Sequence, residues 1–164
     1  MRRPSPFLPA VLGLLGLAGG MAATPRTAQA KDAKEATVPK EADKVFDGVA
    51  AAFRKSSATG VLSFMESGDT GRVWLSLDGV ASGSYTRDHG VEALAKDYFP
   101  KRQVVSLKPG EDCTKGDDWS LSRVYVLTQK VGETQANVLL TVGITRRQVG
   151  ETYAWYLTAV KERG

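Results

Sequence analysis

The only histidine of the chain, His89, lies in a segment that also contains several carboxylates. Asp88 directly precedes it, and Glu92 and Asp97 follow it, so the segment has the residue types needed for general acid–base catalysis. A general base must come within hydrogen-bond reach of a substrate. Ser84, Asp88 and His89 also have the residue types of a hydrolase triad, whose members must converge in space. They instead surround the predicted start of a helix, and there is no second histidine to serve as the base.

Local sequence predicts that His89 belongs to the first turn of this helix. Thr86 is a good N-cap residue, and Arg87, Asp88 and His89 would form the turn that follows it. Apolar residues then recur at helical spacing, and Pro100 ends the helix. This apolar stripe consists of Val91, Leu94, Ala95 and Tyr98. Since His89 falls about half a turn away from the stripe, we expect it near solvent.

A second group of candidates lies in strand-like segments near the C-terminus. Arg123 stands in an alternating stripe whose other members are Trp119, Leu121, Tyr125 and Leu127. If this stripe faces the interior, the guanidinium could bind a carboxylate or phosphate group of a ligand. If it faces solvent, Arg123 only lies over aromatic rings. The opposite stripe is more polar, which favours the first alternative. The candidate ligand-binding residues are therefore Arg123 and Tyr125 of this stripe, together with Trp155 of the last strand-like segment. Arg146 and Arg147 are expected at a solvated strand end.

The residue types argue against a metal centre. The chain has one histidine and one cysteine, Cys113, whereas even a catalytic zinc site requires three protein ligands. The acidic residues around Cys113 lack the spacing of a known calcium loop; they are Glu111, Asp112, Asp117 and Asp118. A single cysteine also permits no intramolecular disulfide. We therefore expect no metal and no cofactor.

Hydrophobic periodicity predicts the remaining elements. Apolar residues recur at helical spacing over 42–55, and a shorter second helix is expected over 59–66. The segments with the alternation of strands are 72–77, 103–107, 119–129, 137–147 and 152–161. The last three are separated by short segments that contain glycine, which is typical of hairpins.

The order of these elements predicts an α+β domain. Two helices and a strand precede the third helix, and a four-strand meander follows, so the helices should lie on one face of a curved sheet. The expected inward stripes are Val73/Leu75/Leu77, Val138/Leu140/Val142/Ile144 and Tyr153/Trp155/Leu157/Ala159. None of these stripes contains a carboxylate or an imidazole. The pattern therefore favours a binding module over an enzyme.

The order of elements and the segment YTRDHGVEALAKDYFP resemble small secreted bacterial members of the nuclear transport factor two-like (SnoaL-like) superfamily. The matching residues are Tyr85, Thr86, Lys96, Asp97, Tyr98 and Phe99. The resemblance covers about residues 45–161. It implies a cone-shaped α+β fold with three helices packed on a curved, mostly antiparallel sheet around a pocket. Relatives include proton-transfer isomerases, dehydratases and cyclases, and others that bind ligands or partners without known catalysis; they often form homodimers through the exposed sheet face. Shared fold does not decide between these functions.

The N-terminus has the three parts of a secretory signal peptide. Arg2 and Arg3 precede an apolar run over 7–23, and the small-residue site Ala28-Gln29-Ala30 follows. The run contains four glycines and a proline, which argues against a retained membrane anchor. We therefore expect a signal peptide over 1–30, a flexible charged leader over 31–41 and a single domain over 42–163, in an exported protein that is periplasmic or secreted.

Removal of the signal peptide changes the charge balance. The whole chain has 22 basic and 18 acidic residues. Three of the basic residues lie within 1–30, where there are no acids, so 19 remain against 18 and the net charge falls from +4 to +1. This near-neutral balance does not favour a nucleic-acid partner.

Two functions remain open from the sequence. The first is an exported, non-enzymatic binding or interaction module that holds a small apolar or anionic ligand in the helix–sheet pocket. The alternative is a small-molecule isomerase, dehydratase or hydrolase that uses His89, Asp97 or Glu92 as its acid or base.

Overall fold

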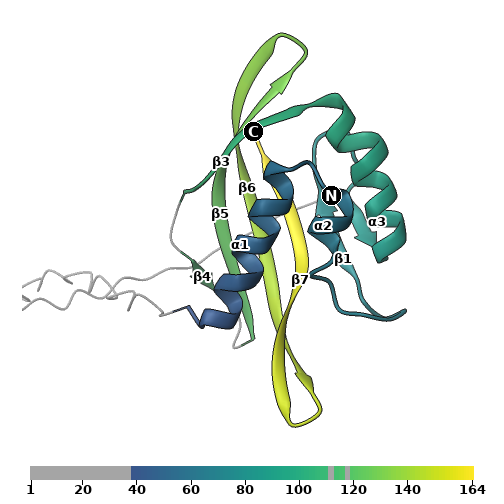
Figure 1. Cartoon of the computed structure of the whole chain (residues 1–164), viewed down its shortest axis with the longest axis vertical. Helices are drawn as coiled ribbons and strands as arrows, with labels where there is room; N and C mark the ends of the chain where they lie inside the picture. Colours follow the sequence, from purple (N-terminus) through teal and green to yellow (C-terminus); the bar gives the residue numbers. More distant parts are fainter. Residues whose placement is uncertain (1–37, 111–112, 117–118) are drawn as a thin grey trace, which may run out of the picture. The chain divides into compact units, whose positions relative to one another are not determined.

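The computed structural model describes residues 38–110, 113–116 and 119–164. These residues form helices that pack on a large, mostly antiparallel sheet, as predicted (Figure 1). The predicted signal peptide, most of the leader and the four acidic residues around Cys113 lie outside the described residues. Within the described ranges, no helix has both the length and the apolar character needed to cross a bilayer.

The first two helices lie close together. Helix α1 (Lys40–Arg54) is amphipathic, as predicted, and buries Phe46, Val49 and Phe53. Helix α2 (Ala58–Leu62) is shorter than predicted and is capped by the Ser57 hydroxyl, which accepts from the Gly60 N–H at 3.1 Å. Gly48 allows α1 to approach the segment after α2, because a Cβ at this position would collide with the Phe64 ring.

The third helical stretch changes its winding along its length. Helix α3 (Arg87–Ala93) begins at the predicted N-cap, since the Thr86 hydroxyl accepts from the His89 N–H at 3.4 Å. A π-helical turn (η1, Leu94–Tyr98) and a 3₁₀ turn (η2, Phe99–Lys101) follow. The wider π turn rotates the later residues, so the buried face consists of Gly90, Ala93, Leu94 and Tyr98. The predicted stripe was therefore wrong at Ala95, which is exposed.

The sheet contains seven strands in the order β2-β1-β7-β6-β5-β3, with β4 also paired to β5. The predicted meander is confirmed, and the pairing of β1 with β7 is the one parallel pair among those described. The short strands β2 and β4 were not predicted. The strands are β1 (Val73–Ser76), β2 (Gly83–Tyr85), β3 (Gln103–Pro109), β4 (Thr114–Lys115), β5 (Ser120–Val131), β6 (Thr134–Val149) and β7 (Thr152–Arg163).

Two tight turns connect the long strands β5, β6 and β7. Each turn has two residues and begins with a glycine, Gly132 or Gly150. Both glycines have positive φ, 59° and 60°, which is the conformation that the first position of a type II′ hairpin turn requires. This explains why the glycine-containing segments correctly predicted the hairpins.

A β-bulge in β7 makes the predicted inward stripe wrong beyond Leu157. Gly143 pairs with Ala159 and Ile144 pairs with Leu157, so Thr158 is an extra residue on β7. Side chains alternate along a strand, and one extra residue therefore reverses the alternation beyond it. Leu157 and Val160 are both buried. Ala159 was wrongly assigned to the inward stripe, and the next inward position after Val160 is Glu162.

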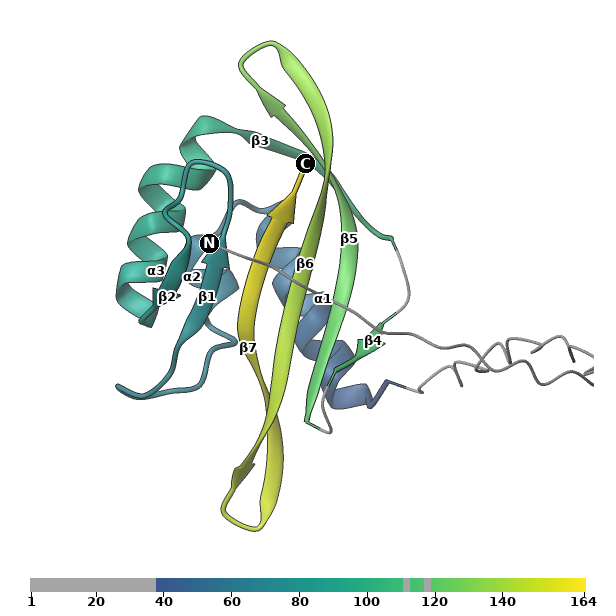
Figure 2. The same ribbon diagram turned by 180° about the vertical axis from the view of Figure 1, so that it is seen from behind.

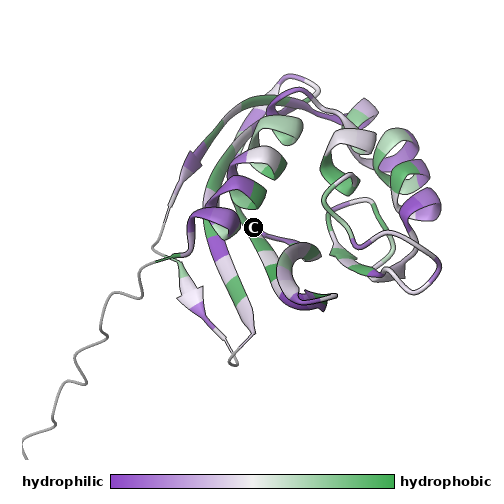
Figure 3. Cartoon of the chain, turned by 60° about the horizontal axis from the view of Figure 1, so that its bottom comes forward, coloured by the Kyte–Doolittle hydropathy of each residue, from purple (hydrophilic) through white to green (hydrophobic). Residues whose placement is uncertain are grey.

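Helices α1 and α3 lie on the same face of the sheet, which we call the inner face (Figure 1). Hydrophobic and hydrophilic residues alternate along parts of the strands (Figure 3), and buried residues alternate with less buried ones along β5. Seen from behind, no described helix covers the opposite face, which we call the outer face (Figure 2). The core between helices and sheet contains, among others, Phe46, Phe53, Leu75, Leu94, Tyr98, Tyr125, Leu140 and Leu157.

Candidate functional site

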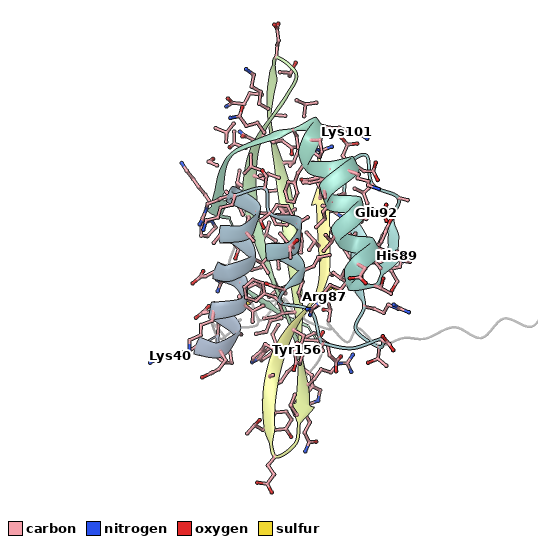
Figure 4. The ribbon with its side chains drawn as sticks, turned by 45° about the vertical axis from the view of Figure 1, so that its right-hand side comes forward. Lys40, Arg87, His89, Glu92, Lys101 and Tyr156 are labelled. Atoms are coloured by element: carbon pink, nitrogen blue, oxygen red, sulfur yellow. The ribbon has the colours of Figure 1, made fainter. Side chains whose placement is uncertain are left out.

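The three acid–base candidates predicted from the sequence lie on the exposed side of the third helical stretch. His89, Glu92 and Asp97 are all exposed, and Figure 4 shows His89 and Glu92 along α3. The hydrogen bond and charge of Lys96 lower the pKa of the Glu92 carboxyl. Asp97 lies 3.9 Å from the Lys101 ammonium. The structure does not bring these three side chains together around the core.

By contrast, the carboxylate of Glu162 on β7 points inward among the described residues. Only 6% of its side chain is exposed, and it faces the Arg102 guanidinium at 3.5 Å. Gln129 donates from Nε2 to Glu162 Oε1 at 2.8 Å, and the Asp78 backbone N–H lies 3.5 Å from Oε2. We call Asp78, Tyr98, Arg102, Gln129 and Glu162 the polar corner. Sequence reasoning missed it because the bulge at Thr158 changes which β7 residues face inward.

Within the polar corner, Arg102 makes hydrogen bonds to two backbone carbonyls as well as its contact with Glu162. Its Nε donates to the Tyr98 carbonyl at 3.2 Å, and its Nη2 donates to the Asp78 carbonyl at 2.8 Å. Nη2 also lies 3.3 Å from the Asp78 carboxylate, and the guanidinium carbon lies 4.1 Å from the centre of the Tyr98 ring. Protein acceptors therefore surround this buried cation, and Glu162 is held by donors on both of its oxygens.

Two polar atoms of this corner are buried without a hydrogen-bond partner among the described residues, the Tyr98 hydroxyl and Gln129 Oε1. Burial, followed by the negative charge of Glu162, raises the pKa of the Tyr98 phenol. Tyr98 is therefore a neutral phenol over the whole physiological pH range.

Arg123 faces the inner side, which was the condition for its guanidinium to bind a ligand. Two acidic side chains of α1, however, already pair with it. Its Nη2 lies 2.7 Å from Asp43 Oδ1, and its Nη1 lies 3.9 Å from Asp47 Oδ1. The guanidinium carbon also lies 4.6 Å from the centre of the Phe46 ring. Burial disfavours the cation, but the hydrogen bonds with Asp43 and Tyr125 outweigh it and raise the pKa of Arg123. The side chain thus fastens α1 to β5.

Tyr125 fastens the same helix. It is almost fully buried, and its hydroxyl donates to the Phe46 carbonyl at 3.2 Å. Burial raises the pKa of its phenol. The contacts of Tyr125 therefore fit a packing role in the core.

Trp155 lies in a different environment at the far end of the inner face. It pairs with Arg146 of β6, whose N–H donates to the Trp119 carbonyl at 2.7 Å. Trp119, directly before β5, thus forms a row with Arg146 of β6 and Trp155 of β7, next to the buried row of Leu121, Ile144 and Leu157. Tyr153 lies two residues before Trp155, on the same face near the start of β7, and its ring stacks with that of Trp119 with centroids 5.6 Å and planes 20° apart. We call Trp119, Arg146, Tyr153 and Trp155 the aromatic end.

Arg146 is not the solvated strand end that the sequence suggested. It is half-buried, and its guanidinium carbon lies 3.9 Å from the centre of the Tyr153 ring and 4.7 Å from that of Trp119. Trp119 and Tyr153 are each 47% exposed. The inner face therefore has a polar corner near one end, buried except for the exposed Asp78 carboxylate, and an accessible cationic and aromatic cluster at the other.

Comparison with known proteins adds information on the fold. No family model and no curated protein matches the chain. A ketosteroid isomerase-like protein from Erwinia carotovora atroseptica is 10% identical with a TM-score of 0.54, over 73% of this chain and 90% of that one. A variant of a protein called Rd1NTF2_05 is 13% identical with a TM-score of 0.52, over 74% and 96% of the two chains. The chain has the nuclear transport factor two-like fold.

A third structural relative comes from Thiobacillus denitrificans, and its name likens it to the association domain of calcium/calmodulin-dependent protein kinase type II. It is 14% identical with a TM-score of 0.53, over 73% of this chain and 91% of that one. The named relatives thus include both an isomerase-like and an association-domain-like protein. The nuclear transport factor two-like fold alone therefore does not choose between catalysis and binding.

The outer face of this nuclear transport factor two-like domain has a cavity of about 160 Å³ near the C-terminus. It is lined by Val126, Asn137, Val138, Leu139, Arg163 and Gly164, so it contains no acid or imidazole side chain. Among the described residues, no group of three or more histidine, cysteine, aspartate or glutamate side chains could hold a metal ion.

Proposed function

We propose that the protein is an exported, non-enzymatic binding module. The supporting observation is the position of its acids and bases. His89, Glu92 and Asp97 are exposed on the helical stretch, and the inward carboxylate of Glu162 is held by Arg102 and Gln129. General acid–base catalysis requires a group that can exchange a proton with a bound substrate. Among the described residues, the inward carboxylate of Glu162 is paired with Arg102 and so is not free to exchange a proton with a substrate.

The ligand in this proposal is a small apolar or anionic molecule. Trp155 belongs to the aromatic end, where half-exposed rings and a cation lie side by side on the inner face. Rings of this kind supply apolar contact area, and a guanidinium supplies hydrogen-bond donors for an anion. Arg123 and Tyr125, by contrast, would bind a ligand only if α1 moved away from β5.

Export is part of the same proposal and rests on the sequence of residues 1–30. The basic start, the apolar run and the Ala28-Gln29-Ala30 site favour transport and cleavage. The mass of the mature protein from an exported fraction tests this directly. A mature chain that still contains residues 1–30 would contradict it.

We also propose that the protein forms a homodimer through the outer face. This face has no described helix over it and bears exposed apolar side chains, including Trp74 and Leu139 (Figure 2). Burial of such side chains against a second copy would be favourable. The mass of the intact native particle distinguishes one chain from two.

Native mass spectrometry of protein purified from its own host tests the binding function. A mass increment of small-molecule size on the mature chain would support it, because a binding module retains its ligand without converting it. A multiple-turnover reaction that is abolished by Glu162→Gln, with the fold intact, would overturn it.

A second candidate function, a small-molecule isomerase, dehydratase or hydrolase, has one observation in its favour. Glu162 and the unpartnered Tyr98 hydroxyl lie together inside the domain, and one structural relative is named as ketosteroid isomerase-like. In this alternative, the acid or base would be Glu162, since His89, Asp97 and Glu92 are exposed on the helical stretch. It requires that substrate displace the contact between Glu162 and Arg102.

A further inference from the structure

The aromatic end differs from the rest of the inner face in having large apolar side chains that are not covered. Trp119 and Tyr153 are each 47% exposed, although the adjacent row of Leu121, Ile144 and Leu157 is almost completely buried. Aromatic rings are costly to leave in water, because each can bury a large apolar area. These two rings nevertheless form an ordered pair, with their planes 20° apart.

The cation of this cluster has a defined orientation. The Arg146 guanidinium lies over both rings, at 3.9 Å from the centre of Tyr153 and 4.7 Å from that of Trp119. Contacts with ring faces use the flat side of a guanidinium and leave its in-plane N–H donors available. Among the described residues, no carboxylate forms an ion pair with Arg146.

Arg102, which follows η2, and Arg123 of β5 lack this combination. Arg102 contacts Asp78 and Glu162, and only 2% of its side chain is exposed. Arg123 contacts Asp43 at 2.7 Å, with 18% of its side chain exposed. An incoming anion would have to displace a carboxylate at either position. Arg146 is therefore the inner-face arginine that is best placed to bind an external anion.

We propose that the aromatic end binds a small aromatic carboxylate. The carboxylate accepts from the in-plane N–H donors of Arg146, and the ring of the ligand packs on Trp119 and Tyr153. This inference rests on the proposed binding function and names its site and ligand class. A planar guanidinium suits a carboxylate because it can donate two parallel hydrogen bonds. An aromatic body suits the two exposed rings because offset stacking adds to the burial of apolar area.

Isothermal titration calorimetry of the mature protein with naphthoate tests the site, and naphthamide serves as a neutral probe of nearly the same shape. We expect saturable binding of naphthoate and about tenfold or more weaker binding of naphthamide, because the hydrogen bond to a charged group is lost. Binding of naphthoate should also weaken as salt rises, since the cluster is half-exposed. This comparison needs no variant, and equal binding of the two probes would overturn the proposal.

Arg146→Gln is the decisive variant, with Arg147→Gln as its matched control. Arg147 is the next residue of β6, is exposed and points to the opposite face of the sheet. We expect naphthoate to bind about tenfold or more weaker to Arg146→Gln and equally well to Arg147→Gln. Undiminished binding to Arg146→Gln, or no saturable binding to the wild type, would overturn the proposal.

Arg146→Lys provides a second variant that retains the charge. It lacks the planar fork, so we expect several-fold weaker binding of naphthoate. Wild-type affinity in this variant would contradict the bidentate contact.

The failure of this inference can be distinguished from the failure of the proposed function. A ligand that is retained by the native protein and survives Arg146→Gln would place the site elsewhere and leave the binding function intact. Catalytic turnover that depends on Glu162 would instead overturn the binding function.

Discussion

The polar corner and the aromatic end both have an arginine stacked on an aromatic ring, but the two arginines differ in burial and in their polar partners. Arg102 is buried, and its N–H groups donate to the Tyr98 and Asp78 carbonyls and face the Glu162 carboxylate. Arg146 is half-buried, and the described contacts of its guanidinium are with the rings of Trp119 and Tyr153. A buried charge must be paired, whereas an accessible one can use water or a ligand. The first arginine thus stabilises the fold, and the second is suited to binding.

The largest expected effect that separates the two regions is on stability. Arg102→Met should reduce the free energy of unfolding by about 3–5 kcal/mol, because it leaves Glu162 as a buried carboxylate without its cation. Arg146→Met should reduce it by about 1 kcal/mol or less, since its contacts are partly exposed. Urea unfolding of both variants measures the difference.

Equal losses in the two methionine variants would contradict the comparison. The slopes of the unfolding transitions should stay the same as in the wild type, because a changed slope would mean that the unfolded ensemble had changed instead.

A smaller effect is expected from the other partner of the buried ion pair. Glu162→Gln should reduce the free energy of unfolding by about 1–3 kcal/mol. The new amide can still hydrogen-bond Gln129, and Arg102 keeps its contacts with Asp78. Thermal or urea unfolding measures the loss, and an unchanged stability would mean that Glu162 is not held as the structure shows.

Much of the fold followed from the sequence because its signals are local. Thr86 capped the helix as predicted, and Gly132 and Gly150 marked two hairpin turns correctly. The polar corner could not be predicted in the same way. It depends on the bulge at Thr158, whose extra residue is opposed by nothing on β6 and has no signature of its own in the alternation.

The candidate site was predicted only in part for a similar reason. Arg123 faces the inner side, as the stripe indicated, but its pairing with Asp43 joins residues far apart in the sequence. Periodicity gives the face on which a side chain lies and does not give its partner across the core. The same limit applies to Arg146, whose aromatic neighbours are Trp119, directly before β5, and Tyr153 of β7.

A third prediction tests whether Arg123 stabilises the fold, as Arg102 does, or resembles Arg146, which we propose binds a ligand. Asp43→Asn should reduce the free energy of unfolding by about 0.5–1 kcal/mol, because Asp43 lies 2.7 Å from Arg123 and is partly exposed. Asp47→Asn is the matched control on the same helix; Asp47 lies 3.9 Å from Arg123, and 78% of its side chain is exposed. We expect a change near zero for this control. Urea unfolding that gives equal losses would show that Arg123 does not hold α1 through Asp43.

The smallest effect should come from the Tyr98 hydroxyl, which is buried without a hydrogen-bond partner among the described residues. Tyr98→Phe should change the free energy of unfolding by no more than about 1 kcal/mol at neutral pH, in the stabilising direction, because it removes an unsatisfied polar group. Tyr98→Phe and the wild type should differ more in stability at alkaline pH. Burial raises the pKa of Tyr98 in the folded chain, whereas a tyrosine of the unfolded chain ionises near its ordinary pKa of about 10.

The sign of this pH dependence follows from proton linkage. Below about pH 10 the phenol is neutral in both states, and its contribution is fully present. As pH rises further, the unfolded chain loses the proton first, so the unfolded state is favoured and stability falls. Tyr98→Phe should therefore lose stability less steeply than the wild type above that pH, although Tyr125, whose pKa is also raised by burial, still contributes. Parallel curves for the two proteins in urea unfolding across this range would place the Tyr98 hydroxyl in contact with water, and the polar corner would then be open at that point.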